Sequence, residues 1–194
     1  MTTTSEAQSF EPERSTSQAR TLHIQFDNWK WRKGTILDSD QKTELYRIEC
    51  HTRAPQIIMY SLRDSVQSPE SRGEVTMHAM TSRMDIRIHN EDIKLTSRGI
   101  LKDGHSYTSP ALEGAKLTWQ SKSKLDYLNL LCLDENAMPV ARTSFANSWK
   151  ATKGGTIELA GDGVVKDGRA MDKVVLTALA MIQQRLVLYA TVIA

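Results

Sequence analysis

The sequence is poor in cysteine: Cys50 and Cys132 are the only two among 194 residues. They are far apart and lie in apolar patterns, so they do not form the closely spaced pair that binds zinc or carries out redox chemistry. We expect two buried free thiols rather than a disulfide. The first twenty residues also lack the apolar stretch of a secretory signal. Both absences predict a cytoplasmic protein.

An excess of either charge is also missing. The chain has 25 Lys and Arg residues against 23 Asp and Glu residues, a net charge of +2. A nucleic-acid-binding protein is expected to be more basic, with its Lys and Arg residues clustered on one face. The nearest basic run, at residues 30–33, is followed closely by Asp38 and Asp40, as is typical of a solvated turn. The composition therefore predicts no nucleic-acid partner.

Recognisable catalytic motifs are absent as well. No serine-nucleophile elbow, glycine-rich phosphate loop or dinucleotide fingerprint occurs. The glycines at residues 153–156 precede a strand pattern, which indicates a hairpin and not a phosphate loop. Metal-binding spacing is lacking among the five histidines, which are His23, His51, His78, His89 and His105. The sequence therefore predicts neither a metal site nor a cofactor.

The segment 1–20 has the composition of a disordered tail. Eight of its residues are Ser or Thr, and Phe10 is its only large apolar residue apart from Met1. Such a segment buries too little apolar surface to offset the entropy lost on ordering. We therefore expect one folded domain at residues 21–194, preceded by a tail that can be deleted without loss of stability.

The region from Thr21 to Leu159 reads as about ten short strands separated by Gly, Pro, Asn, Asp and Ser. With no intervening helix, so many strands predict an antiparallel barrel or sandwich. The expected strands lie at 22–26, 45–50, 56–62, 73–80, 84–89, 93–96, 115–120, 125–133, 140–145 and 156–159.

One hairpin can be aligned residue by residue. A two-residue turn at 81–82 places Val75 opposite Ile88 on a wholly apolar face, and His78 opposite Asp85 on a charged one. The His78–Asp85 pair is the best local acid–base candidate, because a carboxylate beside an imidazole yields a base near neutral pH. The alternative is an exposed ion pair on the outside of the sheet.

The chain changes character near its end, where residues 169–190 have the pattern of a helix with little polar surface. Residues 174–182 are apolar except Thr177, while residues 183–185 (Gln-Gln-Arg) interrupt any membrane-spanning length. A helix that is apolar nearly all round must be buried, and a barrel must be filled. The predicted fold is therefore mainly β, a closed antiparallel β-barrel enclosing the hydrophobic C-terminal helix.

Three segments resemble the tubby C-terminal-like superfamily, and more closely a group of small filamentous-fungal proteins of that fold. They are Ser-Pro-Ala-Leu-Glu-Gly-Ala-Lys-Leu-Thr-Trp-Gln at 109–120, Leu-Cys-Leu-Asp-Glu-Asn-Ala-Met-Pro-Val-Ala-Arg at 131–142 and Ala-Met-Asp-Lys-Val-Val-Leu-Thr at 170–177. The resemblance covers roughly residues 20–190 and implies the barrel around a helix. Tubby and scramblase relatives are linked to membrane phospholipids, yet no clustered basic pocket for an anionic headgroup is evident in this sequence.

The long connection at residues 97–114 is a further candidate, because structureless loops of this length are usually functional or disordered. As a lid it would place His105 and Tyr107 as hydrogen-bond donors over a pocket. The expected apolar lining of that pocket comprises Ile100, Leu101, Leu112 and Trp119. The alternative is a surface loop with no role in binding.

These observations favour a protein that binds a small apolar molecule without a cofactor. Cofactor-free cyclisation or isomerisation, as in a Diels–Alderase of fungal natural-product biosynthesis, is compatible with the sequence because such a reaction needs only a shaped pocket and one or two donors. The alternative is a non-catalytic module that associates with phospholipid, a membrane surface or another protein. The oligomeric state is left open.

Overall fold

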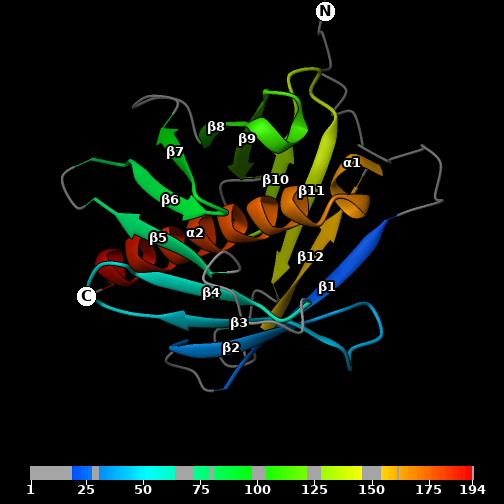
Figure 1. Ribbon diagram of the computed structural model, residues 1–194. Helices are drawn as coiled ribbons and strands as arrows, with labels where there is room; N and C mark the ends of the chain where they lie inside the picture. The colour runs from blue at the N-terminus through cyan, green and yellow to red at the C-terminus, as the bar shows by residue number, and fades with distance from the viewer. Residues whose placement is uncertain are drawn as a thin grey trace, which may run out of the picture.

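The structure is a computed structural model that describes residues 19–27, 31–63, 72–78, 81–97, 104–121, 128–145, 154–160 and 162–193. Twelve antiparallel strands in these ranges form a closed barrel, and the long helix α2 (Gly168–Ile193) runs through it (Figure 1). The strands are β1 (Arg20–Phe26), β2 (Lys33–Leu37), β3 (Glu44–Cys50), β4 (Ile57–Ser61), β5 (Arg72–Met77), β6 (Met84–Ile88), β7 (Glu91–Ser97), β8 (His105–Ser109), β9 (Ala115–Ser121), β10 (Leu130–Leu133), β11 (Pro139–Phe145) and β12 (Gly154–Leu159). The predicted fold class is confirmed.

Each strand pairs with the next along the chain, and β1 closes the barrel by pairing with β12. Closure depends on Gly154, which lies against β1 so tightly that a Cβ atom there would be 2.2 Å from the carbonyl oxygen of Ile24. The next residue, Gly155, leaves room for the ring of Phe145 on β11. Two adjacent glycines thus let three strands approach at the seam.

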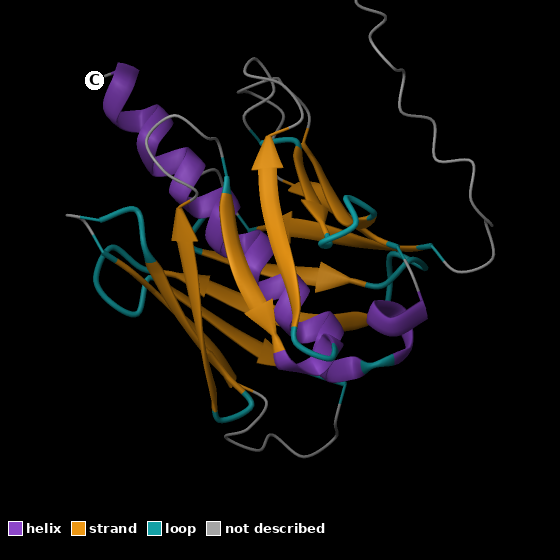
Figure 2. Ribbon diagram, turned by 90° about the horizontal axis from the view of Figure 1, so that it is seen from above, coloured by secondary structure: helices purple, strands orange, loops and turns teal. Residues whose placement is uncertain are grey.

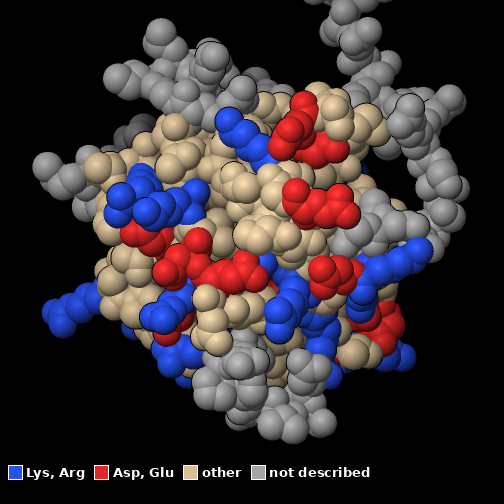
Figure 3. Space-filling view, turned by 45° about the horizontal axis from the view of Figure 1, so that its top comes forward, with Lys and Arg blue, Asp and Glu red and all other residues tan. Residues whose placement is uncertain are grey.

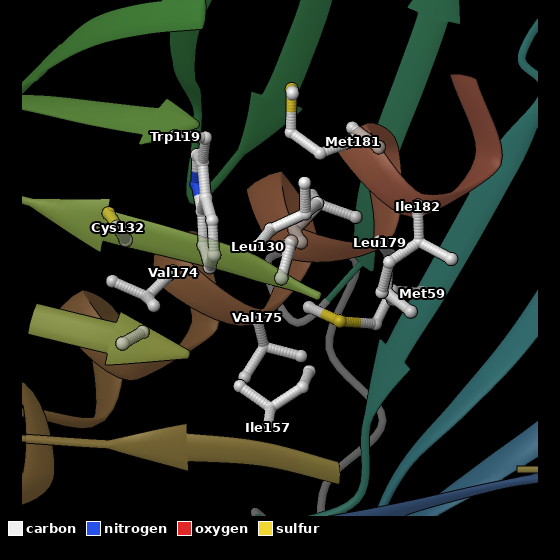
Figure 4. Packing of buried hydrophobic residues seen from close by; sticks show 14 of the residues in the cluster. Met59, Trp119, Leu130, Cys132, Ile157, Val174, Val175, Leu179, Met181 and Ile182 are labelled. Atoms are coloured by element: carbon white, nitrogen blue, oxygen red, sulfur yellow. The ribbon is translucent and has the colours of Figure 1, made fainter. Parts of the chain in front are cut away.

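The barrel interior is filled by α2. Strand residues alternate between the interior and the solvent, as the period of two in β1 and β6 predicts. The helix positions that were expected to be in the core are buried, with exposed fractions of 4% for Leu179 and 2% for Ile182. Figure 4 shows apolar side chains of the helix packed against the wall: Val174, Val175, Leu179 and Ile182 beside Met59, Trp119, Leu130 and Ile157.

Two strands, β2 and β8, were not predicted from the sequence. The prediction of a structureless connection at 97–114 is wrong over residues 105–112, which form β8 and the 3₁₀ helix η2 (Pro110–Leu112). Neither strand has the simple alternation of apolar and polar residues that marks a half-buried strand. In β8 the alternation is hidden because polar residues such as His105 and Ser109 are buried.

The predicted β5–β6 register is wrong by two residues. Val75 pairs with Ile86 rather than Ile88, and Thr76 rather than His78 lies opposite Asp85. Six residues, 78–83, and not two connect the strands, and the amide of His78 bonds to the carbonyl of Arg83 within this connection. Because a shift of two preserves the alternation, the apolar residues still face the core.

The predicted tail lies outside the described residues up to residue 18. Arg20, at its predicted end, already belongs to β1 and forms an ion pair of 2.5 Å with Asp38. At the other end of the chain α2 begins at Gly168 and follows the short helix α1 (Asp162–Lys166). Among the described residues, no helix combines the length and the apolar character needed to cross a membrane.

Candidate functional site

A buried ionic cluster joins the first turns of α2 to the barrel wall. The Asp172 side chain is 4% exposed and its carboxylate accepts hydrogen bonds from Arg63 and from the Tyr46 hydroxyl, the latter at 2.7 Å. His89 Nε2 lies 2.8 Å from the other carboxylate oxygen. Burial, together with the charge of Asp172, raises the pKa of Tyr46 well above its usual value, so the hydroxyl stays protonated and donates.

Local backbone geometry aims two of these groups. His89 and Asn90 form the two-residue turn between β6 and β7, with positive φ angles of 53° and 59°. The turn directs His89 back toward the helix. The next helix residue, Lys173, is fully buried and bonds to Glu91 at 2.7 Å. These contacts hold the helix in the barrel, and their burial leaves little access for a ligand.

Two of the predicted ligand-contacting residues meet at the middle of α2, inside the barrel. The indole of Trp119 donates to the Thr177 hydroxyl at 3.0 Å, and the Tyr107 hydroxyl lies 3.4 Å from the same oxygen. Burial raises the pKa of Tyr107 well above its usual value. The polar atoms of both aromatic side chains thus contact the helix within the core.

The remaining candidates from residues 97–114 are also separated from one another. The His105 side chain is buried, and its Nε2 lies 2.6 Å from the carbonyl oxygen of Ser82 and 3.4 Å from the Gln184 amide. Leu112, in η2, is partly buried against the core. Ile100 and Leu101 lie outside the described residues. The described members of this set therefore form no common exposed surface.

The His78–Asp85 contact exists, but on the outside of the barrel. The two side chains are 2.7 Å apart and are 35% and 37% exposed. Arg83 also contacts Asp85, at 3.0 Å. Partial burial opposes ionisation of Asp85, yet hydrogen bonding to His78 and the charge of Arg83 lower its pKa. The arrangement is that of an exposed ion-pair network, the alternative that the sequence left open.

The cysteines are free, as predicted, although Cys50 is only partly buried while Cys132 is fully buried. Burial raises the pKa of the Cys50 thiol to about 11 and that of the Cys132 thiol further. Both thiols are therefore neutral near pH 7 and poor nucleophiles. No group of three or more His, Cys, Asp or Glu residues in the described ranges could hold a metal ion.

A polar pocket that the sequence did not reveal lies on the outer face of β7, β8 and β9. Its volume is about 400 Å³, and its lining consists of Lys94, Thr96, Ser97, Ser106, Tyr107, Thr108 and Lys116. Neither Lys94 nor Lys116 forms an ion pair with another described residue. The nearby carboxylate of Glu135 accepts a hydrogen bond from the backbone amide of Lys116 at 2.7 Å. Two lysines and several hydroxyl-bearing residues thus line one hollow.

The pocket forms because β7 and β8 separate. They pair only through Thr96 with Ser106 and Ser97 with His105, so the rest of each strand is unpaired with the other. The Thr96 hydroxyl donates to the Ser106 carbonyl at 3.3 Å, which shows that this carbonyl points toward β7. Because backbone direction alternates along a strand, the amide and carbonyl groups of Lys94 and Thr108 also face the gap. The pocket therefore offers backbone groups as well as side chains.

No sequence signal predicts this meeting of lysines. Lys94 lies between Ile93 and Leu95, which identifies it as outward-facing, and Lys116 is outward-facing on β9 for the same reason. Their proximity depends on the order and register of three strands. On the face seen in Figure 3, acidic and basic side chains are interspersed, and no broad basic surface is visible there.

Comparisons with known proteins do not identify the chain. Searches of protein-family models, curated protein sequences and solved structures give no match to it. The structure is compatible with the tubby C-terminal-like fold, since it is a twelve-stranded barrel around a C-terminal helix.

Proposed function

We propose that this protein is a non-catalytic binding module that recognises an anionic, phosphate-bearing phospholipid headgroup at a cytoplasmic membrane surface. One observation carries the proposal: Lys94 and Lys116 converge on a polar pocket of about 400 Å³ beside hydroxyls and strand-edge backbone groups. That volume falls within the range of small-molecule sites.

The chemistry of the lining favours an anionic, oxygen-rich ligand. Lysine ammonium groups bind phosphate as point charges, and the hydroxyls of Ser106 and Thr108 can donate to phosphate or accept from a ligand hydroxyl. An apolar ligand would bury these groups without offering them hydrogen-bond partners, at a cost in binding free energy. The headgroup of a phospholipid meets the requirement.

The first expectation from the sequence, a small apolar ligand with cofactor-free cyclisation, remains a separate prediction. Its residues Tyr107 and Trp119 contact Thr177 in the filled interior. An apolar ligand would therefore need a binding surface other than the described interior. The lining of the polar pocket is mostly polar and offers little apolar surface to such a ligand, which is why we favour the binding module.

The test compares vesicles of phosphatidylcholine alone with vesicles that also contain phosphatidic acid, by cosedimentation. Charge reversal in Lys94→Glu/Lys116→Glu should weaken binding to the anionic vesicles roughly 30-fold or more, since each basic residue near such a surface contributes about 1 kcal/mol. Glycerol phosphate should compete if the soluble headgroup suffices.

The matched control is Lys42→Glu/Arg53→Glu, which makes the same change in net charge at two exposed positions away from the pocket. Equal losses in both double variants would indicate a non-specific charge effect and contradict a specific site. Wild-type binding by the pocket variant would contradict the proposal outright.

A further inference from the structure

The C-terminal turns of α2 expose apolar side chains. Val187 is 50% exposed and Leu188 is 53% exposed, while Leu186 packs partly against the core. The helix continues to Ile193 and projects past the ends of the strands (Figure 2). No charged residue occurs from Leu186 to Ile193. An apolar helix end of this kind indicates a contact surface.

The last turns of α2 contact β8, one of the strands that line the polar pocket. Gln184 contacts His105, which pairs with Ser97, a residue of the pocket lining. Leu188 follows Gln184 by one helical turn on the same helix face, a rise of roughly 6 Å. The exposed apolar residues thus begin about one helical turn beyond Gln184, the α2 residue that contacts β8.

We infer that the C-terminal end of α2 inserts into the interfacial layer of a membrane while the neighbouring pocket holds a headgroup. The inference rests on the proposed function and adds a second, apolar contact to it. The rise from Gln184 to Ile193 is roughly 13 Å, enough to reach the boundary between headgroups and acyl chains, into which interfacial helices are buried by about 5–10 Å.

A second copy of the chain is a poorer occupant. Stable protein interfaces bury about 1,200–2,000 Å² in total. On α2, the large apolar side chains described as exposed are those of Val187 and Leu188, whose area is far too little for such an interface. A bilayer needs no complementary shape, and the energy gained depends only on the apolar area transferred.

The experiment measures partition of the full chain onto phosphatidylcholine vesicles with and without phosphatidic acid. Val187→Asp/Leu188→Asp should lower partition roughly tenfold or more on both compositions, because the apolar contact does not depend on the headgroup. Met138→Asp is the matched control, since Met138 is another exposed large apolar residue and belongs to the β10–β11 connection rather than to α2. It should bind as the wild type does.

A second variant reports on insertion directly. Val187→Trp should gain fluorescence that lipids brominated on their acyl chains quench, beyond any quenching of the wild-type protein. Absence of added quenching, or unchanged partition of Val187→Asp/Leu188→Asp, overturns the inference. If that variant instead converts a dimer to a monomer by light scattering, the surface binds a second copy and the inference is also overturned.

The two proposals fail separately. Loss of binding in Lys94→Glu/Lys116→Glu but not in Val187→Asp/Leu188→Asp supports the pocket and contradicts insertion of the helix end. The reverse pattern supports insertion and contradicts the headgroup pocket. Wild-type protein that binds neither vesicle composition contradicts both.

Discussion

The Tyr46 hydroxyl of β3 lies 2.7 Å from the Asp172 carboxylate of α2, so a buried hydrogen bond joins the barrel wall to the helix inside it. Arg63, from just after β4, and His89, from the β6–β7 turn, contact the same carboxylate. Four separate parts of the chain therefore meet at the Asp172 carboxylate. The cluster fixes the depth and rotation of the helix, because only one placement of α2 satisfies all of these groups.

Asp172→Asn should destabilise the fold by about 3–5 kcal/mol, because it leaves a partly buried arginine without its counter-charge. Tyr46→Phe should cost less, about 1–2 kcal/mol, since it leaves the carboxylate paired with Arg63. Urea unfolding gives both values. Asp92→Asn, at an exposed position of β7, is the control and should change stability little. Equal stability of Asp172→Asn and the control would show that the cluster does not anchor the helix.

Leu179→Ala should lower the free energy of unfolding by about 2–5 kcal/mol, because Leu179 is only 4% exposed and its truncation leaves a cavity in the core. Leu179→Asp should prevent folding, since the new charge has no partner. Val187→Asp, two turns further along the same helix, should fold normally. Normal folding of Leu179→Asp would contradict a helix enclosed by the barrel.

Acid should destabilise the β1–β3 region through two aspartates. Hydrogen bonding to Arg20 lowers the pKa of Asp38, and hydrogen bonding to Thr43 lowers that of Asp40 to about 2 from 3.8. A carboxylate with a depressed pKa in the folded state stabilises the fold above its unfolded pKa, and that stabilisation is lost as the pH falls through the folded value. The melting temperature should therefore fall between about pH 4 and pH 2.

Asp38→Asn should show a smaller fall over that pH range than the wild type, because one of the shifted groups has been removed. Its melting temperature near neutral pH should be lower, since Arg20 loses its partner. The measurement is a series of thermal melts from neutral pH to about pH 2. An identical pH dependence in the two proteins would show that this pair does not contribute.

The exterior His78–Asp85 pair should contribute little to stability. Because both side chains are more than a third exposed, His78→Ala or Asp85→Ala should change the free energy of unfolding by no more than about 1 kcal/mol. Trp119→Ala should cost about 3–5 kcal/mol, because its side chain is fully buried. If the protein is found to act on a small apolar substrate, loss of that activity in His78→Ala would indicate that the His78–Asp85 pair acts as a general base.

Much of the architecture followed from the sequence because it depends on local pattern. Alternation in strands such as β1 and β6 predicted half-buried strands, and the apolar stretch before Gln183 predicted a buried helix. One long apolar helix and many short strands have few ways to bury their surfaces together. Enclosing the helix in a barrel is the one that removes every sheet edge.

The strands that were not predicted from the sequence lack a simple alternation of apolar and polar residues. β8 reads His-Ser-Tyr-Thr-Ser, which is polar throughout apart from Tyr107, yet four of its five residues are buried. Tertiary contacts with Ser82, Thr177 and Gln184 satisfy the inward-facing His105 and Tyr107. A polar residue can be buried once its partners are in place, and those partners are distant in sequence.

The sequence by itself therefore determined that a set of strands surrounds one apolar helix, because side-chain period and hydrophobicity are local properties of the chain. Only the tertiary structure decided where the charges meet. Asp172 finds its partners on three separate elements, and Lys94 and Lys116 share a pocket because β7 and β8 separate next to β9. Strand register and the separation of β7 from β8 set those distances, and both arise from the packing of the whole barrel around its helix.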